Sequence, residues 1–123
     1  MNTEELQNIA IEALNDLKGV DITTFDVRGL TSIADTIIIC TGRSSRHVKS
    51  LAENIIKLAK ERHASYIKSE GEKEGEWVLV DLGDVVVHIM QPATRAFYHL
   101  EDLWEPMESL REKNADSTHR NRD

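Results

Sequence analysis

The sequence has only one cysteine, Cys40, among 123 residues. A single thiol cannot form an intramolecular disulfide or supply a zinc site built from several cysteines. Cys40 ends the apolar run 37–40, where a lone cysteine is typical of a small core residue rather than a nucleophile. The five histidines also lack the helical or strand spacing of a ligand pair. We therefore predict no metal ion and no cofactor.

Long apolar runs are also missing. None approaches the about 18 residues that suggest a membrane span, so no membrane segment is predicted. The first five residues are polar and include Glu4 and Glu5. A secretory signal begins with basic residues followed by an apolar stretch, and a transit peptide avoids acids. Together with the lone thiol, these features predict a cytoplasmic protein.

Basic residues are in the minority, with 15 Lys and Arg against 22 Asp and Glu, for a net charge of −7. The acidic excess lies in residues 1–110, because residues 111–123 hold four basic and three acidic residues. Affinity for a nucleic-acid backbone comes from Lys and Arg that neutralise phosphates, so we predict little direct nucleic-acid binding. An acidic body instead favours a basic protein partner.

The hydrophobic pattern predicts one α/β domain over residues 1–108, since a chain of this length supports one core. The predicted elements are a helix capped by Thr3 and ended by Gly19, a helix at about 45–61, strands at 21–28, 36–41, 66–68, 77–82 and 84–90, and helical turns after Pro92. The order α-β-β-α-β-β-β predicts a mixed sheet of about five strands packed by helices. Residues 36–41 are apolar on both faces and are expected at the centre. Residues 109–123 are polar and aperiodic, which is typical of a disordered tail.

Residues 42–45, Gly-Arg-Ser-Ser, follow a strand and open a helix, where backbone amides can hold a phosphate. They lack the lysine and glycine spacing of a P-loop, and a turn with a helix cap explains them better. They loosely resemble the Gly-Ser motif of nucleotidyltransferases, which needs carboxylates for two magnesium ions. Glu70 and Glu72 have that spacing, but they lie in an acid-rich turn typical of a solvated surface. We predict that the protein is not an enzyme.

The strand at 77–82 is apolar on both faces, with Trp77, Leu79 and Asp81 on one of them. Such a strand buries both faces or presents one to a partner. An aromatic anchor beside a carboxylate is a combination found at binding hot spots, and Tyr98 and Trp104 can extend this surface. The alternative is that Trp77 simply packs beneath the C-terminal helical turns.

Seven segments follow one another along residues 3–104. They are Asp26-Val27, residues 32–35 (Ser-Ile-Ala-Asp), Cys40-Thr41-Gly42, residues 44–48 (Ser-Ser-Arg-His-Val), Glu70-Gly71, residues 77–88 and residues 95–104. In this order they resemble the iojap family, the ribosomal silencing factors. The resemblance implies an α/β fold related to the nucleotidyltransferases but without their activity.

The resemblance also implies binding to large-subunit ribosomal protein L-fourteen, where the small subunit docks. Such binding blocks joining of the subunits and represses translation when nutrients are short. The family implies a possible homodimer when free and a monomer on the ribosome. The contact residues that it implies are Trp77, Asp81, Leu82, Asp84, His88, Tyr98 and Glu101. The alternatives are a large-subunit assembly factor and a nucleotidyltransferase-like enzyme that uses Ser44 or Ser45 near Asp35 and Glu70.

Overall fold

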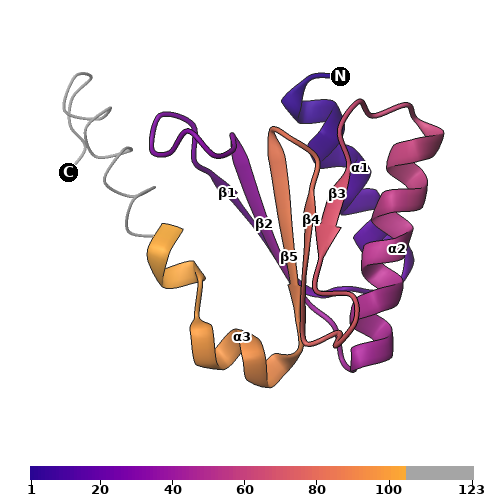
Figure 1. The fold of residues 1–123 in the computed structure, drawn as a ribbon. Helices are drawn as coiled ribbons and strands as arrows, with labels where there is room; N and C mark the ends of the chain where they lie inside the picture. The colour runs from indigo at the N-terminus through magenta and orange to yellow at the C-terminus, as the bar shows by residue number, and fades with distance from the viewer. Residues whose placement is uncertain (105–123) are drawn as a thin grey trace.

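The computed structural model describes residues 1–104, in which helices pack on a five-stranded mixed sheet (Figure 1). The elements are α1 (Thr3–Asp16), β1 (Val20–Asp26), β2 (Thr36–Thr41), α2 (Ser45–Glu61), β3 (Lys68–Glu70), β4 (Trp77–Asp81), β5 (Val85–Met90) and α3 (Pro92–Tyr98). This order confirms the predicted fold class. The boundary predicted at residue 108 and the tail predicted at 109–123 lie outside the described residues. No helix within residues 1–104 has the length and apolar character needed to cross a bilayer.

The strands are arranged in the order β1-β2-β5-β4-β3. β2 and β5 are parallel, with Thr36 opposite Val85, and the other neighbours are antiparallel. All six residues of β2 are buried, as predicted for a strand covered on both faces, but the middle position of the sheet is held by β5, with β2 beside it. β4 and β5 pair as an antiparallel hairpin. Gly83 turns it at φ 94°, a left-handed conformation that favours glycine, and its amide donates to the Asp81 carboxylate at 2.8 Å.

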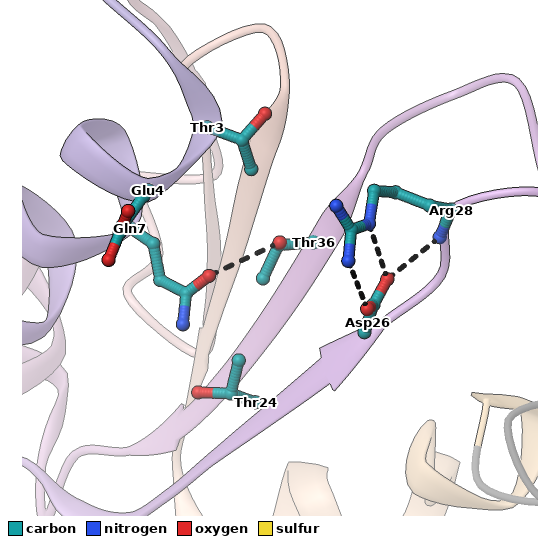
Figure 2. Close-up of a pocket in the computed structure, with 7 residues that line it drawn as sticks. All are labelled: Thr3, Glu4, Gln7, Thr24, Asp26, Arg28 and Thr36. Atoms are coloured by element: carbon teal, nitrogen blue, oxygen red, sulfur yellow. Dashed lines mark hydrogen bonds and ion pairs between the residues drawn. The ribbon is translucent and has the colours of Figure 1, made fainter.

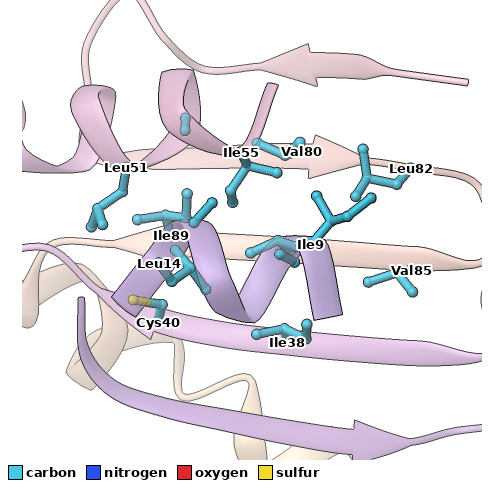
Figure 3. Close-up of a cluster of buried hydrophobic side chains, with 14 of the residues drawn as sticks. Ile9, Leu14, Ile38, Cys40, Leu51, Ile55, Val80, Leu82, Val85 and Ile89 are labelled. Carbon is cyan, nitrogen blue, oxygen red and sulfur yellow. The ribbon is translucent and has the colours of Figure 1, made fainter. Parts of the chain in front are cut away.

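α1 and α2 cover one face of the sheet (Figure 1). Figure 3 shows the core that they form with the strands, in which Ile9 and Leu14 of α1 and Leu51 and Ile55 of α2 meet Ile38, Cys40, Val80, Leu82, Val85 and Ile89. The Cys40 thiol is buried here, and burial raises its pKa to about 11. A thiol with that pKa is unreactive near neutral pH, so its predicted role as a core residue is confirmed.

Several predicted boundaries were wrong. α1 ends at Asp16 with Leu17 as its C-cap, before the predicted stop at Gly19, and β1 ends at Asp26 rather than at residue 28. The N-cap of α1 is Asn2 rather than Thr3: the Asn2 side chain accepts from the Glu5 amide at 2.8 Å, and the Glu5 carboxylate accepts from the Asn2 amide at 3.0 Å. Adjacent Asn and Thr are both good caps, and Glu5 selects Asn2 because it lies three residues further on. The edge strand β3 is Lys68–Glu70 rather than 66–68. An edge strand this polar has no apolar alternation to mark its register, which β4 sets through the Lys68–Asp81 pair.

The other face of the sheet is covered only in part. Its core contains Phe25, Val27, Ala34, Ile37, Ile39, Val86 and Met90, with Trp77, Leu79, Leu100 and Trp104 packed against it. The chain after β5 turns across this side, so that Leu100 and Trp104 cover part of it. α3 itself has no buried residue. This face is therefore the one on which apolar side chains remain open to solvent.

Candidate functional site

Five side chains from β4, β5 and α3 gather on the partly covered face, and we call them the aromatic surface. They are Trp77, Leu79, His88, Phe97 and Tyr98. The Trp77 and Tyr98 rings lie 4.8 Å apart between centroids, and the Phe97 ring meets Tyr98 edge-on at 5.0 Å. Such geometry is favourable for aromatic pairs. The structure thus brings together Trp77, His88 and Tyr98, three of the seven predicted contact residues.

α3 holds its aromatic side chains outward. Phe97 is 79% exposed and Tyr98 is 54% exposed. Beside them, Glu70, Gly71, Trp77 and Leu79 line an open hollow of about 310 Å³. Trp77 is half-buried and packs against the second core, so the alternative that it packs beneath the C-terminal turns holds in part. Exposed apolar groups that adjoin one another are typical of a surface that binds a partner.

His88 orients Trp77 rather than facing solvent. The Trp77 Nε1–H donates to His88 Nδ1 at 3.0 Å, and the two rings lie 5.9 Å apart. Only a neutral imidazole can accept this bond. Burial lowers the pKa of His88 from 6.5 to about 4, so the ring is neutral at physiological pH.

The depressed pKa of His88 predicts acid sensitivity. The unfolded chain takes up a proton between pH 6.5 and 4 that the folded chain does not bind. The free energy of unfolding should therefore fall by about 2 kcal/mol from pH 7 to pH 5. The contribution of neutral His88 to this free energy is present above pH 6.5 and is lost as the pH falls toward 4. Urea unfolding at both pH values measures this change. His88→Gln keeps an acceptor for Trp77 but does not titrate, so it should lose less stability over the same interval; parallel losses in both proteins would contradict the assignment.

The two predicted aspartates lie at the other end of the hairpin. Asp81 is about 13 Å along β4 from Trp77, at about 3.3 Å per residue. Asp84 is exposed, and the Thr3 hydroxyl lies 3.4 Å from its carboxylate and 2.9 Å from that of Asp35. The carboxylates of Asp81 and Asp84 form an acidic end of the hairpin. This end lies beside the start of α1 and is separate from the aromatic surface.

Leu82 does not belong to either surface. Its side chain is 2% exposed and points into the core beneath α1 and α2, opposite to Trp77. Successive side chains of a strand alternate between faces, and Leu82 lies an odd number of residues from Trp77. Direct contact between this side chain and a partner is therefore inconsistent with the structure. Its role is to support the hairpin from within.

Glu101 is also engaged inside the molecule. Its carboxylate accepts from Arg95 Nε at 2.6 Å, and both side chains are largely shielded, with 18% and 12% exposure. Burial alone would raise the pKa of Glu101, but its own backbone amide and Arg95 lower it below the usual value. The carboxylate is thus held ionised in an internal pair with Arg95, and its predicted contact with a partner stays a prediction.

Arg95 is the residue that sequence reasoning missed. Besides Glu101, its guanidinium donates to the carbonyl of Asp21 at 2.7 Å and to the hydroxyls of Thr41 and Thr23 at 2.9 and 3.2 Å. It therefore fastens α3 and the segment after it to β1 and β2. The only signal in the sequence was an arginine just before Phe97 and Tyr98, and it did not reveal partners more than 50 residues away.

A second hollow, of about 410 Å³, lies between the start of α1 and strands β1 and β2 (Figure 2). Figure 2 shows two polar interactions among the residues that line it. The Thr36 hydroxyl donates to Gln7 at 3.3 Å, and Arg28 pairs with Asp26 at 2.8 Å. Its lining is thus a set of structural contacts between the helix and the sheet.

The serines of the predicted enzymatic alternative, Ser44 and Ser45, lie far from Asp35 in the structure. The Ser44 hydroxyl caps α2 by accepting from the His47 amide at 3.1 Å, and the Ser45 hydroxyl donates to the Glu74 carbonyl at 2.9 Å. Asp35 precedes β2 whereas both serines follow it, so the length of that strand, about 20 Å, separates them. The structure therefore does not assemble a serine with Asp35.

Comparison with known proteins gives a consistent result. The family described as ribosomal silencing factor during starvation matches residues 1–123. A ribosomal silencing factor from Chromobacterium violaceum is 49% identical over 104 residues, which are 85% of each chain. A crystal structure of a protein from the same species superposes with a TM-score of 0.83 at 48% identity, covering 85% of this chain and 88% of that one. A mouse protein named for mitochondrial assembly of the ribosomal large subunit is 32% identical over 100 residues, 79% of this chain and 44% of its own.

Proposed function

This chain belongs to the family of ribosomal silencing factors, and we propose that it represses translation by binding the large ribosomal subunit so that the small subunit cannot join. The observation that carries the proposal is the aromatic surface, with Phe97 and Tyr98 held outward on a helix that buries nothing. Exposed aromatic side chains are the typical anchors of protein interfaces. The aromatic surface therefore supports a function in binding, and silencing by binding requires no chemistry.

The proposed partner on the subunit is ribosomal protein L-fourteen. Ribosomal proteins that lie among phosphates are basic, and the acidic end of the hairpin, with Asp81 and Asp84, complements such a surface. Tyr98 and Trp77 would enter the contact as anchors, and the carboxylates would set its orientation. Leu82 and Glu101 support these side chains from inside the fold.

The proposed mechanism is steric. A specific interface buries about 800 Å² on each partner, so the proposed contact would extend from the aromatic surface to the end of the hairpin. The rest of this 14.0 kDa protein then stands on the face where the small subunit docks. The same surface is open to a second copy of the chain when the protein is free, and such a homodimer would have to dissociate before binding. Because subunits join in the cytoplasm, that is the proposed location.

Large-subunit assembly is the second candidate function, and the name of the mouse relative favours it. Both functions use the same contact and differ in when it is made. An assembly factor binds immature particles, whereas a silencing factor binds mature large subunits. Purified mature subunits therefore separate the two.

A subunit-joining assay tests the proposal. Mature large and small subunits are mixed with and without the protein, and joined particles are measured by light scattering. We expect joining to be prevented at saturating protein, and immobilised protein to retain purified L-fourteen but no small subunit. Normal joining at saturation, or binding to immature particles alone, would reject silencing as the function.

A further inference from the structure

α2 is the basic side of an acidic protein. Residues 43–62, which contain this helix, hold six basic and two acidic residues, whereas the rest of the chain holds nine basic and 20 acidic ones. The neighbouring helix α1 has four acidic residues and no Lys or Arg between Thr3 and Asp16. The helical layer is thus divided into one acidic and one basic helix. The net charge of −7 conceals this division.

Four of the basic residues lie in a single line along α2, and we call them the basic stripe. They are Arg46, Lys49, Lys57 and Lys60. Their spacings of three, eight and three residues place them within one side of a helix with 3.6 residues per turn, opposite the buried side that contains Leu51 and Ile55. The stripe is about 21 Å long, since fourteen residues rise by about 1.5 Å each.

The basic stripe is not neutralised within the protein. In the part of the chain that the structure describes, no ion pair joins any of its four residues to an acid, whereas Arg62 just beyond the helix pairs with Glu12 at 3.1 Å. Arg46, Lys57 and Lys60 are exposed, and Lys49 is half-buried beside Gly75. Two acids, Glu53 and Glu61, lie on this side of the helix against the four basic residues. The charges are therefore available to an anionic partner.

We propose that the basic stripe binds the phosphate backbone of RNA in the large ribosomal subunit. The choice of RNA as the polyanion rests on the proposed function. α2 and α3 lie on opposite sides of the sheet (Figure 1), so the stripe and the aromatic surface contact different components of the subunit. Acidic residues on α1 and at the end of the hairpin repel phosphates, which leaves α2 as the side that faces RNA. Lysine-rich contacts of this kind position a protein without reading sequence.

Fluorescence anisotropy with a labelled RNA duplex of about 20 base pairs and the full 123-residue chain tests this inference. Four phosphate contacts predict a slope of about −3 for log affinity against log salt concentration. Lys57→Gln with Lys60→Gln should weaken binding about tenfold and reduce the size of the slope by about 1.5. The matched control is Lys18→Gln with Lys68→Gln, two exposed lysines outside the stripe, which changes the net charge equally and should leave binding unchanged.

Equal losses of RNA affinity in both double variants would show that only the net charge matters. That result would overturn the proposal that the basic stripe binds RNA. Absence of salt-dependent binding by the unaltered chain at low salt would also overturn it. The basic residues at 105–123 are present in every variant and cancel in the comparison. The assay contains no ribosomal protein, so its failure would leave the binding of L-fourteen untouched, and failure of the joining assay would leave the RNA result standing.

Discussion

Tyr98→Ala is expected to weaken binding to the large ribosomal subunit about 30-fold, which corresponds to about 2 kcal/mol for an interface anchor. The Tyr98 ring is 54% exposed and stacks against Trp77 at 4.8 Å, so it is available to a partner and held in place before binding. No residue of α3 is buried, and therefore the free energy of unfolding should change by less than about 0.5 kcal/mol.

Tyr66→Ala is the matched control for this prediction. Tyr66 is 48% exposed, nearly as much as Tyr98, but it lies in the connection between α2 and β3. Co-sedimentation of each variant with purified large subunits, over a range of protein concentrations, gives the affinities. Equal affinities of Tyr98→Ala and Tyr66→Ala would show that the aromatic surface is not the contact.

Leu82→Ala, in contrast to Tyr98→Ala, should reduce stability and not ribosome binding. We expect it to lower the free energy of unfolding by about 3 kcal/mol, within the range for a buried leucine. Its side chain is 2% exposed and packs in the core that α1 and α2 share with the sheet. Removing it leaves a cavity that the helices and strands around it cannot fill without moving. The affinity of the folded fraction for the large subunit should stay the same, because Leu82 points away from the aromatic surface.

Urea unfolding followed by tryptophan fluorescence measures the loss in Leu82→Ala. Leu17→Ala serves as the control, since Leu17 follows α1, is 39% exposed and should cost less than about 0.5 kcal/mol. A stable Leu82→Ala protein with weakened ribosome binding would restore Leu82 to the contact surface. It would also show that the hairpin adopts a different orientation when bound.

Most of the fold could be predicted because its elements carry strong periodicity. Residues 37–40 are all apolar, and that run alone indicates a strand with neighbours on both sides. The strand order could not be predicted in the same way. Alternation within β2 and β5 does not say that they pair with each other, because two buried strands have the same pattern.

The candidate site could be predicted only for residues whose exposure follows from the pattern of a single strand or helix. Trp77 and Tyr98 follow from aromatic residues on an apolar strand and on a short helix. The pairing of Glu101 with Arg95 was not predicted, because the two residues meet through a turn at His99, which has a left-handed φ of 51° that no pattern indicated. The basic stripe was overlooked because the charge was summed over the whole body, although its spacing along α2 was legible in the sequence.

The parallel pairing of β2 with β5 has a consequence for synthesis of the chain. Thr36 pairs with Val85, so the middle of the sheet cannot form until the second half of the protein has been made. At roughly 5–20 residues per second, β2 waits several seconds between its own emergence and that of β5. During that interval a strand with four consecutive apolar residues has β1 as its only neighbour and an open edge. Aggregation of incomplete chains should therefore begin at β2, and the β4–β5 hairpin, once released, ends the period of risk by filling the open edge.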